Sequence, residues 1–299
     1  MRKPFSTKKS RAIFLTILAG ALWGTSFPII KIGLTNTDPF AFVFWRFLVS
    51  TATLLIIMLA LRKLEFKMPD KKLLIFLGIT NGIGYLIQYA SMGYTTAAKA
   101  ALFINLSAIW VAILSPKLLG ETFSRKKTVG IAFGLVGIVL VSTNLNFAAL
   151  RGGQLIADLS LVISGVTWAI FMIYNKKLIS NSTSATFQSM TWVLLFTFLS
   201  IAPFALVAGP KLFALSSFAW LGIFWTAIVC WIIPYYLWLE GLKHLSASTS
   251  TVLLLSEIVV AVILSIVVLK EPVTVFSSIG ALLIVIAIAI VSVQNKKKG

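Results

Sequence analysis

Glu257 lies inside a long apolar segment, VLLLSEIVVAVILSIVVLKEP, which runs from Val252 to Pro272. It stands about ten residues from either end of the helix expected at 247–268, close to the centre of a bilayer. Inserting a charged carboxylate at that depth costs about 2.5–3.5 kcal/mol. Glu257 is therefore either a site for a substrate or a proton in a wet cavity, or a neutral acid that is hydrogen-bonded to a neighbouring helix.

A second group of candidates lies in the segment NGIGYLIQYASMGY. Asn81, Tyr85 and Gln88 (or Tyr89) follow i, i+4, i+7 spacing, so they share one face of a helix. A polar and aromatic face on a membrane helix either lines a cavity or bonds to neighbouring helices. Both interpretations stay open, and these residues are candidate substrate contacts.

Four further residues are candidate substrate contacts: Trp231, Tyr235, Lys99 and Asn105. Trp231 and Tyr235 are four residues apart, which places them on one face of the same expected helix. Lys99 opens an expected helix, where it either attracts an anion at the mouth of a cavity or anchors the helix at the membrane interface. Hydrogen bonding between helices explains Asn105 as well as a substrate contact does.

Three charged residues are expected to be structural. Arg46 lies about two turns into an expected helix, from where its side chain can reach the outer headgroups. Glu121 and Glu271 each precede another expected helix, where a carboxylate complements the positive end of the helix dipole.

The elements that must position these residues are membrane helices. The chain has 299 residues, of which 59% are hydrophobic and 11% charged, against about 45–50% and about 25% in soluble proteins. A barrel strand would alternate polar and apolar residues, which these segments do not. We expect an all-α polytopic membrane protein with ten transmembrane helices, at 12–34, 40–61, 73–92, 97–116, 128–146, 155–174, 186–208, 217–239, 247–268 and 276–293.

The net charge is +18, and the basic residues are distributed unevenly along the chain. Twenty of the 26 Lys and Arg residues fall at the chain ends or in alternate connections, and three fall in the remaining connections. The positive-inside rule then places both termini in the cytoplasm, with the protein in the inner membrane. Nucleic acid is not an expected partner, because no soluble segment is long enough to form a recognition domain.

Catalytic residues and metal ligands are not expected. The chain has one cysteine, Cys230, and one histidine, His244, and it lacks HExxH and Walker motifs. A membrane-embedded enzyme would need a nucleophile with a base, or clustered metal ligands. We therefore predict no cofactor, and an enzyme is the less favoured alternative from another functional class.

The two halves of the chain resemble each other. LLGETFSRKKTVGIAFGLVGIVLVS (118–142) aligns without a gap on VLKEPVTVFSSIGALLIVIAIAIVS (268–292). WGTSFPIIK likewise matches WAIFMIYNK, which pairs Trp23 with Trp168 and Lys31 with Lys176.

Five expected helices separate the paired positions. Because five is odd, the halves 1–150 and 151–299 would have opposite orientations in the membrane. An inverted-topology repeat is the usual architecture of secondary transporters, with the site between the halves near the midplane.

The chain resembles the EamA-type transporters of the drug/metabolite transporter superfamily over nearly its whole length. The signals are the WGTSFPIIK start, RFLVSTATLL after Pro39, and the paired Glu121 and Glu271. The resemblance implies a ten-helix bundle with a central cavity, alternating access, and export or import of amino acids and other small metabolites. It also places Trp168 near the cavity.

One departure from the family concerns the fourth and ninth helices. The family often has Glu-Pro there, whereas this chain has Ser107-Ala108 and Glu257-Ile258. Without proline, we expect both helices to be less kinked.

We therefore expect a secondary carrier of small organic metabolites, with amino acids or related compounds as the favoured class. Facilitative exchange of nucleotide-type or vitamin-type metabolites is the alternative. A zwitterion would offer its amine to Glu257 and its carboxylate to hydroxyls, amides or Lys99. Protons are the candidate coupling ion, since a sodium site would need several oxygen ligands that the sequence does not identify. The expected partners are the substrate and lipid, and the sequence leaves both monomer and homodimer open.

Overall fold

The computed structural model describes residues 8–65, 68, 70–120, 125–143, 145, 155–181, 186–270 and 274–292. All secondary-structure elements in this part of the chain are helices. They are α1 (Lys8–Gly24), α2 (Ser26–Gly33), α3 (Pro39–Ala60), α4 (Lys71–Met92), α5 (Ala97–Asn105), α6 (Ser107–Leu119), α7 (Arg125–Thr143), α8 (Leu155–Asn181), α9 (Thr186–Ile201), η2 (Ala202–Phe204), α10 (Ala205–Ala208), η3 (Gly209–Leu212), α11 (Ser217–Phe224), η4 (Trp225–Ile232), α12 (Ile233–Leu242), α13 (Ala247–Leu254), α14 (Ser256–Leu269) and α15 (Val275–Ser292).

Within the described residues, eight helical segments are long and apolar enough to cross a membrane. Several of them join consecutive elements, such as α1 with α2, α5 with α6, and α13 with α14. In α7 and α15 the apolar stretches Thr128–Gly137 and Ser278–Ala287 are shorter. The expectation of an all-helical, multi-pass membrane protein is thus confirmed, with eight candidate spans.

Side-chain caps and proline fix where several helices begin. Asp38 accepts hydrogen bonds from the backbone N–H groups of Phe40 and Ala41, with Pro39 in the first position of α3. Ser216 and Ser246 cap α11 and α13 in the same way. These side chains satisfy backbone donors that helix starts leave unpaired, and proline is favoured at the first helical position.

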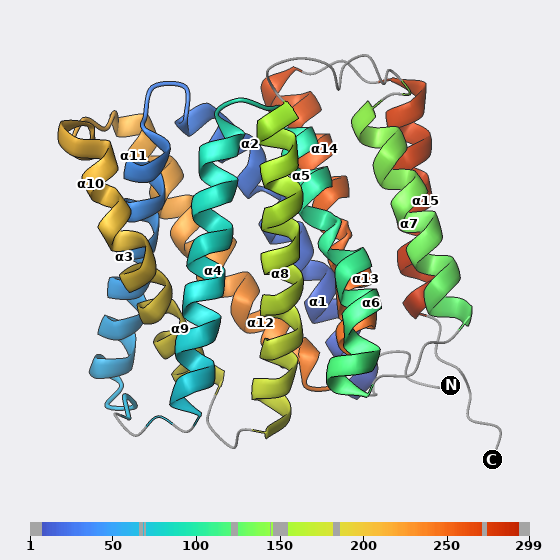
Figure 1. The fold of residues 1–299 in the computed structure, drawn as a ribbon. Coiled ribbons are helices and arrows are strands. Elements are labelled where there is room, and N and C mark those ends of the chain that lie inside the picture. Colours follow the sequence, from blue (N-terminus) through green and yellow to red (C-terminus); the bar gives the residue numbers. More distant parts are fainter. Residues whose placement is uncertain are drawn as a thin grey trace.

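The helices pack as two bundles (Figure 1). In the first, which we call the α4–α8 bundle, α4 packs against α8 and α9, and α8 also packs against α5 and α6. In the second, the α1–α12 bundle, α1 packs against α12, α13 and α14, while α2, α3 and α11 surround η4. Helices α7 and α15 lie side by side and pack against each other more extensively than any other two elements.

Three of the long helical segments are interrupted by a single residue. At Thr25, Leu106 and Leu255 the backbone N–H bonds to the carbonyl three residues earlier rather than four. Pro28 explains the first interruption, because it lacks the N–H that would bond to the carbonyl of Gly24. The fourth and ninth helices are interrupted although neither has a proline at the interruption.

The interruptions of the fourth and ninth helices coincide with close backbone contacts. A methyl group added at Gly165 of α8 would lie 3.0 Å from the carbonyl oxygen of Phe103, in the last turn of α5. A methyl group added at Gly24 of α1 would collide with the carbonyl oxygen of Glu257 in α14. Because glycine allows the backbones to approach so closely, each interrupted helix is held against a helix of the other half of the chain.

The two ends of the bundle differ in charge. One end, which we call the basic end, holds the start of α1 and the connections from α3 to α4 and from α12 to α13 (Figure 1). The opposite end holds the connections from α2 to α3, from α4 to α5 and from η3 to α11. Most lysines and arginines of the described connections lie at the basic end. The connections that the sequence predicts to be rich in positive charge thus lie at one end of the bundle.

Candidate functional site

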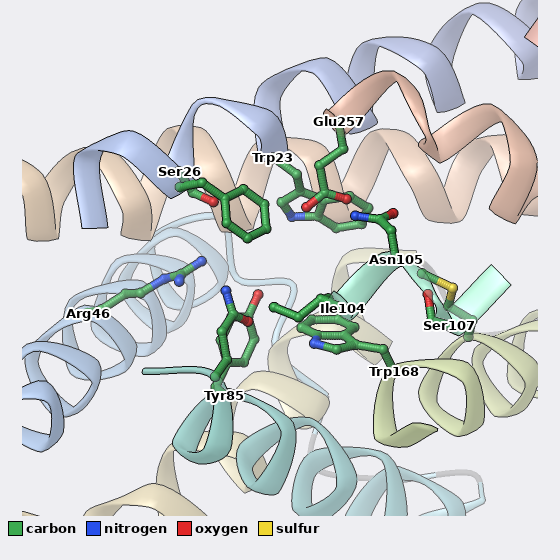
Figure 2. A pocket seen from close by; sticks show the side chains of 12 residues that line it. Trp23, Ser26, Arg46, Tyr85, Ile104, Asn105, Ser107, Trp168 and Glu257 are labelled. Carbon is green, nitrogen blue, oxygen red and sulfur yellow. The ribbon is translucent and has the colours of Figure 1, made fainter. Parts of the chain in front are cut away.

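A cavity lies between the two bundles (Figure 2). The α1–α12 bundle contributes Trp23, Ser26, Phe27, Arg46 and Glu257. The α4–α8 bundle contributes Tyr85, Gln88, Ile104, Asn105, Ser107, Trp168 and Met172. All three helix interruptions adjoin lining residues, since Ser26 follows Thr25, Leu106 separates Asn105 from Ser107, and Glu257 lies two residues after Leu255.

Glu257 lies in the first turn of α14 and faces the cavity. The preceding residue, Ser256, donates a hydrogen bond to the carbonyl oxygen of Ile17 in α1 (2.9 Å). This bond and the close contact with Gly24 fix the start of α14 against α1. The positive end of the α14 dipole favours a carboxylate at this position. Glu257 therefore lies at a cavity and at the positive end of a helix dipole, and both favour an acidic side chain inside a membrane.

The partner of Glu257 across the cavity is Asn105 of α5 (Figure 2). The Asn105 amide acts on the carboxylate as a hydrogen-bond donor. The same amide nitrogen also donates to the carbonyl oxygen of Ala101 (2.8 Å), which fixes its orientation. The two interpretations of Glu257 therefore do not exclude each other, because it faces the cavity and also contacts a neighbouring helix.

Arg46 is enclosed by aromatic rings rather than by headgroups. It is 1% exposed, and its Nη1 donates to the hydroxyl of Tyr89 (2.5 Å). Its guanidinium carbon lies 4.7 Å from the ring centroid of Tyr85 and 5.4 Å from that of Phe47. Such rings stabilise a cation through their negative faces. An arginine that reaches the outer headgroups, which the sequence allowed, is therefore wrong for this structure.

Three donors on residues that line the cavity have no hydrogen-bond partner. The Nε of Arg46 and the indole Nε1 atoms of Trp23 and Trp168 are buried without a hydrogen-bond partner. The Trp168 ring meets the Tyr85 ring edge-on at 5.0 Å between centroids. A buried donor without a partner costs about 1–3 kcal/mol, and an acceptor on a ligand would remove that cost. Residues of the lining therefore carry unused donors, of which the Trp168 Nε1 lies beside Gly84 of α4.

The cavity brings together five of the ten expected substrate contacts, namely Glu257, Trp168, Tyr85, Gln88 and Asn105. Six lining residues were not among the expected ones: Trp23, Ser26, Phe27, Ile104, Ser107 and Met172. The internal repeat carried a signal for Trp23, which pairs with Trp168, and for Ser107, which aligns with Glu257. The apolar residues of this set look like ordinary membrane-helix residues, so their sequence carried no signal.

Two residues of the expected stripe on α4 do not line the cavity but bond to neighbouring helices. The amide nitrogen of Asn81 donates to Thr197 Oγ1 in α9 (3.0 Å). Tyr89 is the hydroxyl partner of Arg46. Asn81 therefore ties α4 to α9, and Tyr89, which is not part of the lining, holds Arg46 in place.

Three other expected contacts also lie away from the cavity lining. Trp231 packs on Tyr235 with 4.6 Å between ring centroids. The Tyr235 hydroxyl donates to Asn175 Oδ1 in α8 (2.7 Å). Lys99 is 8% exposed in the first turn of α5. The neighbours that these residues meet, rather than their spacing within one helix, separate them from the cavity.

Glu121 and Glu271, which were expected to be structural, lie outside the described residues. Within the part of the chain that the structure describes, no group of three or more His, Cys, Asp or Glu side chains is arranged to hold a metal ion.

Comparison with known proteins agrees with this architecture. The model of the EamA-like transporter family matches residues 10–143 and 155–293. An uncharacterized transporter of Archaeoglobus fulgidus is 24% identical, and the match covers 96% of this chain and 99% of that protein. A probable amino-acid metabolite efflux pump of Escherichia coli is 27% identical over 59% of this chain and 57% of its own length.

The fold recurs in a solved crystal structure that is 20% identical, with a TM-score of 0.76. The match covers 94% of this chain and 96% of that one. An all-helical bundle with apolar spans, a cavity between two groups of helices, and a family match across both halves agree with one another. The chain belongs to the EamA-like transporter family.

Proposed function

We propose that this protein is a secondary active transporter that moves amino acids or related small metabolites across the inner membrane by alternating access. The observation that carries the proposal is the cavity between the two bundles, which is lined by two ionisable groups, Glu257 and Arg46. Ionisable groups at such depth are costly and usually mark a substrate or ion pathway. Because Glu257 and Arg46 lie apart on the same wall, they favour a solute that carries one positive and one negative group.

The chemistry of the lining favours a zwitterion with an apolar body. Glu257 and Asn105 would receive the ammonium group, as a carboxylate and an amide oxygen both accept hydrogen bonds. Arg46 would bind the carboxylate through its unpaired Nε, in place of the hydroxyls or Lys99 considered from the sequence. Trp168 and Phe27 supply apolar surface for the side chain of the solute. The relative from Escherichia coli that is named an amino-acid metabolite efflux pump supports this class and favours export.

The proposal includes ten membrane helices in two inverted repeats, residues 1–150 and 151–299. Helix packing supports it, because a two-fold axis in the membrane plane would exchange equivalent pairs. The contact of α1 with α12 corresponds to that of α8 with α4, and the contact of α1 with α14 corresponds to that of α8 with α5 and α6. Helices α7 and α15 would pair with each other across the axis. The two segments that match the family model also coincide with the two halves.

The charge distribution supports a cytoplasmic location for the basic end and for both termini, by the positive-inside rule. We further propose that protons are the coupling ion, with Glu257 as the group that exchanges a proton or the substrate ammonium. Facilitated exchange without a gradient remains the contrasting mechanism, and transport assays separate the two. Catalysis plays no part in this proposal.

Counterflow in proteoliposomes tests the function. Vesicles with purified protein and a high internal concentration of one unlabelled amino acid should accumulate the labelled form, across a panel with apolar and aromatic side chains. The Glu257→Gln variant should lose at least roughly tenfold in rate, as expected when one charge-assisted hydrogen bond is lost. Glu65→Gln is the matched control, because Glu65 is exposed in the connection from α3 to α4 at the basic end.

Two results would contradict the proposal. Absence of counterflow for every amino acid in the panel, with folded protein in the vesicles, would remove the substrate class. A Glu257→Gln variant that transports at the original rate, with unchanged dependence on pH, would remove Glu257 from the mechanism.

A further inference from the structure

The cavity is bounded by two bundles, so any change in its access must separate them at one end or the other. Hydrogen bonds that cross from one bundle to the other therefore oppose opening at their own end. At the level of the cavity, Arg46 of α3 bonds to Tyr89 of α4. Two lysines make comparable crossings nearer the two ends of the molecule.

The first lysine crosses at the end opposite the basic end. Lys31 lies in the last turn of α2 and belongs to the α1–α12 bundle. Its Nζ donates to the carbonyl oxygens of Thr95 (2.7 Å) and Met92 (3.1 Å). Met92 is the last residue of α4, and Thr95 lies in the connection from α4 to α5. Lys31 therefore ties α2 to the end of α4 and to the connection that follows it.

The second lysine crosses near the basic end. Lys176 lies near the end of α8 and belongs to the α4–α8 bundle. Its Nζ donates to the carbonyl oxygen of Leu242 (2.7 Å), the last residue of α12 in the other bundle. Lys176 therefore ties α8 to the end of α12.

The two lysines are equivalent by sequence. Lys31 and Lys176 end the matching segments WGTSFPIIK and WAIFMIYNK. In both cases an ammonium group bonds to carbonyls at the carboxyl end of a helix, where the helix dipole is negative and the last carbonyls lack partners within the helix. The same lysine-to-carbonyl contact thus occurs near each end of the molecule, and each copy joins the two bundles. A pair of gates requires this arrangement.

We propose that Lys31 and Lys176 are paired latches, which hold the cavity closed at the opposite end and at the basic end respectively. Release of the Lys31 latch lets the bundles separate at the opposite end, and release of the Lys176 latch lets them separate at the basic end. The inference rests on the proposed alternating-access function. It adds the groups that hold each side closed, and it does not depend on which solute is carried.

The two ends are not equally secured. Near the basic end, the hydroxyl of Tyr235 in α12 also donates to Asn175 in α8, and Ser115 of α6 pairs with Ser248 of α13 (2.7 Å). Both of these bonds also cross between the bundles. Loss of the Lys176 latch should therefore shift the balance less than loss of the Lys31 latch does.

Labelling of one cysteine in the cavity tests the latches. The reporter is Ser107→Cys on a Cys230→Ser background, because Ser107 lines the cavity and Cys230 is fully buried. A small membrane-impermeant methanethiosulfonate reagent is applied to right-side-out and to inverted membrane vesicles. Lys31→Met should raise the labelling rate from the opposite end and lower it from the basic end, and Lys176→Met should do the reverse. We expect shifts of roughly tenfold, as for loss of one hydrogen bond to a charged group.

Matched controls remove the same charge without the bond between bundles. Lys177→Met is the control for Lys176, since Lys177 is exposed and faces the Tyr174 ring. Lys211→Met, in exposed η3, is the control for Lys31. Both controls should leave the labelling ratio unchanged. Lys31→Gln and Lys176→Gln keep a hydrogen-bond donor, and they replace the methionine variants if those do not fold.

The latch proposal is overturned if both lysine variants shift labelling toward the same side, or if neither shifts it more than its control. Labelling needs no substrate, so it is independent of counterflow. Opposite shifts in a protein without amino-acid counterflow would support the latches and reject the substrate class. Amino-acid counterflow without opposite labelling shifts would support the substrate class and reject the latches.

Discussion

The two walls of the cavity carry different chemistry. The wall from the α1–α12 bundle holds both ionisable groups, Glu257 and Arg46. The wall from the α4–α8 bundle holds the neutral groups Gln88 and Asn105, together with aromatic rings. The halves of the chain resemble each other in sequence, yet the position that aligns with Glu257 is Ser107, on the neutral wall.

This difference assigns separate tasks to the two bundles. If the bundles move relative to each other, both charges travel with one of them, so a zwitterion would keep its two ionic contacts while the neutral wall changes position. The neutral wall would then set the shape and the hydrogen-bond pattern that the solute must match. Three predictions test this division, beginning with the largest effect.

Moving the carboxylate to the other wall should abolish transport. The double variant Glu257→Ser with Ser107→Glu keeps the net charge and places the acid in the first turn of α6, another helix start that favours a carboxylate. We expect a folded protein whose counterflow is at least roughly a hundredfold slower, since two charge-assisted contacts would no longer lie on one bundle. Size-exclusion chromatography and counterflow measure the two properties. Recovery of the original rate would show that the asymmetry of the walls has no functional weight.

The close backbone contacts should respond unequally to an added methyl group. At Gly24 the methyl would meet the carbonyl oxygen of Glu257 and, at 2.9 Å, the Cβ of Val260. At Gly165 the nearest atoms are backbone oxygens at 3.0 and 3.1 Å. Overpacking costs typically about 1–3 kcal/mol, so Gly24→Ala should lower the thermal unfolding temperature in detergent more than Gly165→Ala does.

The glycine pair also separates stability from transport. Because Gly24 contacts the residue that bears the carboxylate, Gly24→Ala should reduce counterflow at temperatures at which the variant is still folded. Gly165→Ala, which displaces the wall without charges, should reduce it less. An equal loss in the two variants would argue against a special role for the placement of Glu257.

The indole N–H groups give the smallest expected effect. Trp23→Phe and Trp168→Phe keep an aromatic ring and remove a donor that has no partner in the structure. Each variant should raise the KM for an amino acid by about threefold to tenfold, the size of a neutral hydrogen bond, and should leave the thermal unfolding temperature nearly unchanged. Because these residues come from different walls, equal effects would mean that the solute bridges both. An unchanged KM in both variants would mean that the indoles only pack.

Sequence alone was sufficient for the features that depend on the bilayer. Apolar segments of spanning length force helices because lipid cannot pair with backbone groups, and the alternating charge pattern orders their ends. The matching segments around Trp23 and Trp168 predict an internal repeat. Glu257 was recognisable as a candidate from its depth alone, because few polar residues surround it.

Only the tertiary structure decided which polar residues share the cavity. Tyr85 and Tyr89 lie on the same helix four residues apart, yet Tyr85 lines the cavity whereas Tyr89 lies outside the lining and bonds to Arg46. Spacing within one helix fixes a face but not the neighbour that this face meets. The position of Arg46 inside an aromatic cage, and the crossings of Lys31 and Lys176 between bundles, depend on contacts between residues far apart in the chain. Those contacts follow from how whole helices pack, which periodicity along one segment does not encode.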